Sequence, residues 1–329
     1  MVQEEKKLYP FRFCPLTDDY DWGSEAFLLA DLGYRDTLVR DGWLAGNQMG
    51  EVMDTYMERV VGDNVYEYYG RQFPVCVRKI HVVGRMPLRV HPDDETAGQR
   101  YDFLGKEKLW YVLRCGKNAK VMLGFREDTD AAAVYGKCGD GSIDELLNTV
   151  APHSGQYFHI PPGTPHCAEG DIDILEISQS SPVDICMCGW GKTVSSEEFD
   201  DALTIVDALD FIDYKAFKSE KPGPHLVDIP QFRVEKIELK AALHSFCGHE
   251  SPFVLYVCVG GAAAVQIDVL GQTASFPFKS GEVLLVPAEC NDFRVVPTEQ
   301  AAVLLELEVP HIVEKDSYIN PESPASLSD

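Results

Sequence analysis

The 329-residue sequence has few basic residues, no C-x-x-C pair and no long apolar run. Lys and Arg number 29 against 53 Asp and Glu, so the formal net charge is −24, which disfavours nucleic acid and membrane partners by repelling their phosphates. No apolar stretch approaches the ~20 residues that span a bilayer. The start, MVQEEKKLYPF, lacks the apolar core of a secretory signal. We therefore expect a cytoplasmic protein.

The ten cysteines agree with a reducing compartment. Their spacing does not match a zinc ribbon or a dithiol redox motif. Most of them lie inside apolar runs such as FPVCVRKI and LYVCVGG. That setting is typical of buried free thiols.

Short strand-like runs separated by Gly and Pro turns dominate the chain, for example LWYVLRC, KVMLGF and EVLLVPA. Many short strands at this spacing are typical of sandwiches and barrels. The length is roughly two to three times that of a usual domain and predicts two packed units. The fold class is therefore mainly β, with a few inserted helices.

Few segments have a helical pattern. Ser142-x-x-Glu145 and Ser195-x-x-Glu198 are capping-box patterns that predict helices over 142–150 and 196–217, and a third helix is expected over about 50–69. The predicted organisation is an N-terminal domain over 1–218, a linker over 219–230, a C-terminal domain over 231–312 and a loose tail over 313–329.

A short pattern occurs twice and links the two predicted domains. Residues 155–166 have the pattern G-x5-P-x-G-x2-H, and residues 281–292 repeat it as G-x5-P-x-E-x2-D. Each copy predicts a turn glycine, a strand, a turn that begins with proline, and then an inward-pointing residue. The first copy ends in a histidine that could bind a metal, whereas the second ends in an aspartate. We therefore expect the second domain to be structural.

The first copy resembles the second signature of the cupin fold, a small double-stranded β-barrel, and LRVHPDD places His91 near a strand end upstream. The two motifs face each other in a cupin, so His91 and His166 are expected to converge on one cavity. More specifically, YDWGS, VHPDDETA, GKEKLWYVL, IPPGTPH and LEISQSS recur in this order in the type I mannose-6-phosphate isomerases. The chain is identified as a divergent member of that family, with two cupin-like β-barrel or jelly-roll units.

The resemblance implies an enzyme, an intramolecular aldose–ketose isomerase. It would interconvert mannose 6-phosphate and fructose 6-phosphate, or a related sugar phosphate, by moving a proton between C1 and C2 through an enediol. Zinc orients the sugar oxygens in the family. The alternative is a non-catalytic sugar-phosphate-binding cupin that has lost the zinc site. The expected partner is a small sugar phosphate, and the expected state is a monomer or a weak homodimer.

When the functional residues of the family are matched by position to this sequence, His91 and His166 correspond to two zinc ligands. Lys106 and Lys108 share one strand face, which points to the cavity if the family register holds. A base is also required, for which Glu51, Glu176 or a histidine is suitable. The candidates are Lys192, Glu51, Lys106 and Glu176 for catalysis and Arg78, Arg89, Lys108 and Trp22 for substrate binding.

Two of the departures from the family matter most. Lys108 lies where the family has its ligand glutamate, and Lys192 lies where it has an arginine, so the charge is kept but the bidentate fork is lost. An ammonium about 4 Å from a divalent ion costs several kcal/mol, and zinc would need a substitute ligand. Glu107, Glu176 and His159 are the alternatives, although Glu107 is expected on the opposite strand face.

Residues 78–120 carry a local positive charge in this acidic chain. This range contains ten basic and five acidic residues. Such a cluster suits the capture of a small anion such as a sugar phosphate. The other explanation is that many of these side chains are solvated groups at strand edges.

Overall fold

The computed structural model describes residues 6–190, 204–219, 223–247, 252–269 and 271–310. The chain divides into two compact units. Unit 1 comprises Met1–Pro15, Leu28–Pro74 and Pro222–Asp329, and unit 2 comprises Leu16–Phe27 and Val75–Lys221. The boundary between Lys221 and Pro222 falls inside the predicted linker over 219–230. However, residues 1–15 and 28–74, which we expected in the N-terminal domain, belong to the same unit as the C-terminal residues. The sequential division into 1–218 and 231–312 therefore differs from the structural one.

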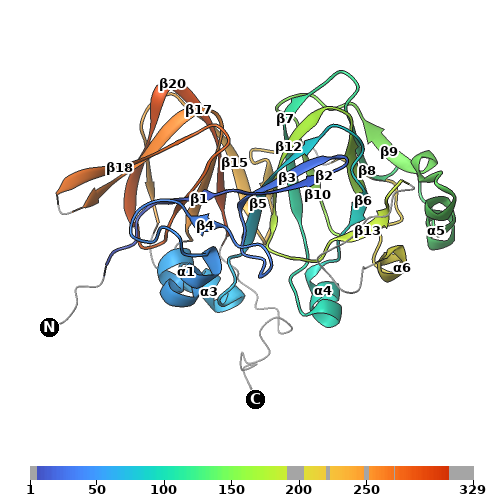
Figure 1. The fold of residues 1–329 in the computed structure, drawn as a ribbon, viewed down its shortest axis with the longest axis horizontal. Coiled ribbons are helices and arrows are strands. Elements are labelled where there is room, and N and C mark those ends of the chain that lie inside the picture. The colour runs from blue at the N-terminus through green and yellow to red at the C-terminus, as the bar shows by residue number, and fades with distance from the viewer. Residues whose placement is uncertain (1–5, 191–203, 220–222, 248–251, 270, 311–329) are drawn as a thin grey trace, which may run out of the picture. The chain divides into compact units, whose positions relative to one another are not determined.

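Strand pairing explains why unit 1 is discontinuous. Near the N-terminus, Phe11 lies opposite Leu285 in an antiparallel pair, so the first strand completes a sheet formed mainly by C-terminal residues. The sheet has nine strands among the described residues. They are β1 (Phe11–Cys14), β4 (Leu38–Val39), β14 (Val227–Asp228), β15 (Arg233–Leu239), β16 (Leu243–Phe246), β17 (Val254–Val269), β18 (Gln272–Lys279), β19 (Val283–Val286) and β20 (Asp292–Glu308) (Figure 1).

The helix expected over about 50–69 is present as three short helices of unit 1, α1 (Met49–Tyr56), α2 (Glu58–Val61) and α3 (Asp63–Tyr69). The breaks fall at Met57, with a φ of 44°, and at Gly62, with a φ of 88°. Positive φ at both positions stops an α-helix from continuing. The prediction of helix here was therefore right in type but not in continuity.

The repeated pattern has a structural counterpart in each unit. Gly155 and Gly281 have φ values of 82° and 87°, and each precedes a strand and a proline turn. The ends of the two copies differ. His166 is fully buried, whereas the carboxylate of Asp292 is largely exposed and pairs with His244. The expected inward-pointing residue is therefore absent from the second copy, since Asp292 faces outward.

Unit 2 contains two antiparallel sheets among its described residues, and the prediction of a mainly β fold is confirmed (Figure 1). One sheet has six strands and the other five. The first comprises β2 (Leu16–Tyr20), β3 (Gly23–Leu29), β5 (Val75–Val82), β7 (Lys108–Cys115), β10 (Tyr157–Ile160) and β12 (Ile172–Gln179), and the second β6 (Leu88–Val90), β8 (Lys120–Phe125), β9 (Leu147–Val150), β11 (His166–Glu169) and β13 (Ile185–Cys188).

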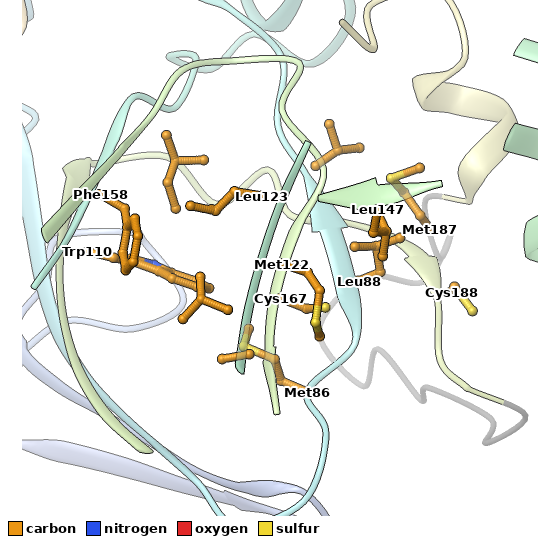
Figure 2. Packing of buried hydrophobic residues seen from close by; sticks show 14 of the residues in the cluster. Met86, Leu88, Trp110, Met122, Leu123, Leu147, Phe158, Cys167, Met187 and Cys188 are labelled. Atoms are coloured by element: carbon orange, nitrogen blue, oxygen red, sulfur yellow. The ribbon is translucent and has the colours of Figure 1, made fainter. Parts of the chain in front are cut away.

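Both sheets of unit 2 contribute to one hydrophobic core. Trp110 of β7 and Phe158 of β10 are opposite in register, and their rings lie together in Figure 2. Met122 of β8 and Cys167 of β11 are likewise paired and lie close to each other in the same view. Burial of these side chains from two sheets supplies the main driving force for the sandwich.

The helices of unit 2 differ from those predicted. They are α4 (Asp94–Tyr101), α5 (Ala131–Asp140), a 3-10 turn (Ile143–Glu145) and α6 (Ile205–Ala208), which contacts β13. The helix expected over 142–150 is wrong: only the 3-10 turn forms, and the chain then enters β9. For 196–217, residues up to 203 lie outside the described residues, and α6 is the helix in the part from 204 onward. The predicted tail over 313–329 also lies outside them.

The ten cysteines are free thiols, as expected, and six of them are buried. Among the described helices, none combines the length and the apolar character needed to cross a bilayer.

Candidate functional site

Five strands of unit 2 bring the predicted site residues together. Glu176 of β12 lies opposite Arg78 of β5 and Trp110 of β7, and His166 of β11 lies opposite Arg89 of β6. Alternate residues of a strand face the same side, so these positions can direct their side chains into one interior.

A glycine turn connects the two histidine motifs. Gly163 of IPPGTPH has a φ of 74°, and its N–H donates to the carbonyl of His91 at 2.7 Å. A Cβ at this position would lie 2.6 Å from the carbonyl oxygen of Phe211. The turn therefore requires glycine, and it fixes the segment after β10 against the end of β6.

The acidic part of VHPDDETA is structural. Asp93 caps α4 by accepting from the N–H of Thr96 at 2.8 Å. The carboxylate of Asp94 accepts from the N–H of Gly105 at 2.8 Å and from the side-chain amide of Gln179 at 2.9 Å. These bonds tie the segments that carry His91 and Lys106 to the end of β12.

The two histidines meet in the interior, as predicted. His91 is 2% exposed and His166 is 0% exposed, and their ring centroids are 5.0 Å apart. Nδ1 of His91 lies 3.0 Å from the carbonyl of Val183, and Nδ1 of His166 lies 2.8 Å from that of Thr164. A carbonyl can only accept, so each Nδ1 carries the proton and each Nε2 of the neutral ring holds a lone pair.

Burial lowers the pKa of both histidines. Next to burial, the cation of Lys108 is the largest cause, and the pKa falls to about 3 for His166 and well below the ordinary value for His91. Both imidazoles are therefore neutral at physiological pH.

Lys108 lies beside His166 in the interior. Its Nζ is 3.3 Å from Nε2 of His166 and 3.3 Å from Oε2 of Glu176, and the residue is 1% exposed. Burial lowers the pKa of Lys108 to about 7, although Glu176 opposes the shift. The amine therefore titrates near neutrality while it donates to the imidazole.

Glu176 is held by several donors. The indole N–H of Trp110 donates to it at 2.7 Å, and Nε of Arg78 donates at 2.8 Å. Burial alone would raise the pKa of Glu176, but Arg78 and then Lys108 outweigh burial and hold it well below the ordinary value. The carboxylate is therefore ionised and fixed, and it is a weak base.

Two carboxylates that the sequence analysis did not single out pair with the arginines. Glu25 accepts from Arg78 at 3.0 Å and from Arg89 at 2.7 Å, and Asp184 accepts from Arg89 at 3.2 Å. Neither has a local signal, since WGSEAF and SSPVDIC contain no recognisable site pattern. The predicted substrate-binding arginines are thus engaged within unit 2. Trp22 packs beside Arg89, whose guanidinium lies 5.7 Å from its ring centroid.

Lys106 differs from its neighbours. It is 6% exposed, and within the described part of the chain its ammonium forms neither a hydrogen bond nor an ion pair within 4 Å. Burial lowers its pKa. Lys106 is therefore a cation that a bound anion could satisfy.

The remaining candidates are not among the residues described so far. Glu51 belongs to unit 1, where its carboxylate accepts from the N–H of Gln48 at 2.9 Å and caps α1. Lys192 lies outside the described residues. Glu107 and His159, which we considered as substitute ligands, hydrogen-bond to each other at 2.7 Å.

The residues do not fit zinc. A catalytic zinc site normally has three protein ligands. The histidines offer two Nε2 lone pairs, but the third position holds the ammonium of Lys108, and the carboxylate of Glu176 is already bound by Arg78 and Trp110. Over the described ranges, no group of three His, Cys, Asp or Glu side chains could hold a metal ion.

Comparisons with known proteins agree with the fold. No family model matches the sequence. The chain is 24% identical to a mannose-6-phosphate isomerase of Bacillus subtilis over 310 residues, which is 87% of this chain and 95% of that protein. It is also 23% identical to the mannose-6-phosphate isomerase of Streptococcus mutans over 223 residues, 65% of this chain and 68% of that protein.

Solved structures show the same architecture. The crystal structure of the mannose 6-phosphate isomerase from Bacillus subtilis matches with a TM-score of 0.76 at 19% identity, covering 91% of this chain and 99% of that chain. A zinc-bound mannose 6-phosphate isomerase matches with a TM-score of 0.66 at 12% identity, again over 91% and 99%. Sequence similarity and fold extend over most of the chain, which is therefore similar in sequence to mannose-6-phosphate isomerases and shares the architecture of their solved structures.

Proposed function

We propose that this chain is an aldose–ketose isomerase that interconverts mannose 6-phosphate and fructose 6-phosphate or a related sugar phosphate. The names of its relatives support this reaction type. The observation that carries the proposal is the buried contact of Lys108 with His166 and Glu176. Proton transfer between adjacent sugar carbons needs an acid–base group near neutral pKa and a cation for the enediolate, and both are available here.

We assign the proton transfer to Lys108. Its pKa of about 7 means that both protonation states are populated near neutral pH, which is the condition for an efficient acid–base group. Glu176 is too weak a base for this role because Arg78 holds its pKa down. Glu176 instead acts as a positioning residue that keeps Nζ of Lys108 next to His166.

We assign the anionic part of the substrate to Lys106. A phosphate ester or a developing enediolate oxygen would supply the partner that this buried ammonium lacks among the described residues. Arg78 and Arg89 are already bound to Glu25. Their role is then to hold the carboxylates of the site in place, and contact with the substrate falls to the lysine.

The test is turnover by chelator-treated protein. Mannose 6-phosphate is supplied in D2O, and NMR follows fructose 6-phosphate and the entry of solvent deuterium into the sugar. Lys108→Met removes the amine at similar volume, and we expect it to reduce kcat about 10²-fold or more. Lys120→Met is the matched control, since Lys120 lies on the surface in a 3.5 Å ion pair with Glu169, and it should retain wild-type turnover.

The second candidate function is a non-catalytic sugar-phosphate binder. The observation that favours it is the mutual pairing of Arg78 and Arg89 with Glu25 and Asp184, which balances these charges without a ligand. Calorimetric binding of the sugar phosphate by wild-type protein, with no product and no deuterium entry, would support the binder and reject the isomerase.

A further inference from the structure

The two buried imidazoles have the orientation of metal ligands. In metalloproteins a ligating histidine usually donates its other ring N–H to a carbonyl or carboxylate, which fixes the tautomer. His91 and His166 both do this through Nδ1, to the carbonyls of Val183 and Thr164. Nε2 of His91 is buried and makes no hydrogen bond within the described ranges, with the nearest carboxylate oxygen, on Asp184, 3.7 Å away.

The spacing of the rings also suits a shared ion. Two imidazoles bound to zinc at about 2.0–2.1 Å with a tetrahedral angle have ring centroids about 5 Å apart. The observed separation is 5.0 Å. The Nδ1 hydrogen bonds and the ring spacing of a two-histidine metal centre are therefore both present.

The ammonium of Lys108 lies against Nε2 of His166, on the side of the ring from which an ion would have to bind this histidine. It is 3.3 Å from Nε2 of His166 and 3.3 Å from a carboxylate oxygen of Glu176. A divalent ion next to this ammonium would be repelled in a buried, poorly screened setting. One hydrogen bond from Nζ already uses the lone pair of His166 that zinc would need.

We infer that Lys108 replaces the metal ion with a cation of the chain itself, so that the native protein is metal-free and Lys108→Glu opens a divalent-metal site on His91 and His166. The third ligand would be the new carboxylate. Glu176 does not supply it, because Arg78 and Trp110 hold that group. The inference concerns metal content and stands whether or not the protein turns over a sugar.

The experiment measures metal per full-length chain after purification without chelator, followed by competition against a chromophoric chelator. We expect wild type to contain almost no zinc and Lys108→Glu to contain about one ion per chain. Lys120→Glu makes the same charge change on the surface and should bind none. Adding His91→Ala to Lys108→Glu should abolish the gain, and the cobalt form of Lys108→Glu should show four-coordinate visible absorption that the double variant lacks.

Two measurements guard against a folding defect. Lys108→Gln removes the ammonium without adding a ligand and should bind zinc at least tenfold more weakly than Lys108→Glu. The Tm of wild type should not change with zinc, whereas that of Lys108→Glu should rise. Stoichiometric zinc in wild type that His91→Ala removes would overturn the inference, as would a folded Lys108→Glu variant with no more zinc than Lys120→Glu.

Discussion

Replacing Arg78 with methionine tests what the buried ion network contributes to stability. Arg78 is 5% exposed, and it donates to Glu176 at 2.8 Å and to Glu25 at 3.0 Å. Methionine retains much of the aliphatic volume but leaves two buried carboxylates without this cation. Removing one partner of a buried ion pair costs about 3–5 kcal/mol, and we expect a loss in that range for unit 2.

Arg114→Met provides the matched control. Arg114 lies on β7 with its side chain 49% exposed, and it bonds to Asp171 and Asp173. Solvent screens such pairs, so the same substitution should cost much less than Arg78→Met. Both variants replace an ion-paired arginine with methionine, and they differ in whether the ion pair is buried.

Urea unfolding followed by tryptophan fluorescence measures the loss. Trp22, Trp110 and Trp190 belong to unit 2, and a Trp43→Phe background removes the signal of unit 1. Both wild type and variants are compared in that background, and the free energy of unfolding is extrapolated to water.

The pH dependence gives a second check. In wild type, burial raises the pKa of Glu176 and Arg78 lowers it, with the net shift downward. Without Arg78 that pKa rises, so the folded variant binds a proton that the unfolded chain does not, and its deficit should shrink from about pH 8 to about pH 5. A loss no larger than that of Arg114→Met would refute the reasoning.

Three further predictions concern single residues. Lys106→Ala should weaken sugar-phosphate binding by about 1–3 kcal/mol in calorimetry, and an unchanged Kd would contradict its role. Burial raises the pKa of Asp31 to about 7, so wild-type stability should fall by up to about 4 kcal/mol as pH rises from about 4 to about 7, and Asp31→Asn should abolish that fall in thermal unfolding. Gly163→Ala should lower the free energy of unfolding by at least about 1–3 kcal/mol, because the φ of Gly163 is 74° and the carbonyl of Phe211 blocks a Cβ. Gly139→Ala, at an open position on α5, should be neutral or stabilising, and equal effects of the two substitutions would contradict the turn argument.

The sequence was sufficient to predict much of the site, because motif positions carry strand geometry with them. The alternation that places Lys108 inward also sends Glu107 outward, where it meets His159. The convergence of His91 and His166 followed from two motifs at facing positions. The assignments of catalysis, substrate and metal to individual residues remain predictions.

The features that the sequence did not predict depend on pairing between strands that are distant along the chain. Glu25 and Asp184 are close to Arg89 only after strands distant in the sequence have assembled, and neither has a local pattern. The helix predicted over 142–150 failed for a similar reason: the capping pattern formed one turn, and LNTV then paired with β8 in the sheet. In α4, the residues DETAGQRY have too little apolar periodicity to indicate a helix, although Asp93 caps it.

The threading of the chain through unit 1 constrains synthesis on the ribosome. Phe11 emerges early, but its partner Leu285 is not made until most of the protein has been translated. The nascent chain must therefore keep the apolar residues of its first strand away from wrong partners while unit 2 is completed. Delayed closure of this kind favours transient aggregation and chaperone binding. A fragment that begins at the linker would have the same difficulty permanently, with the edge of β19 left uncovered.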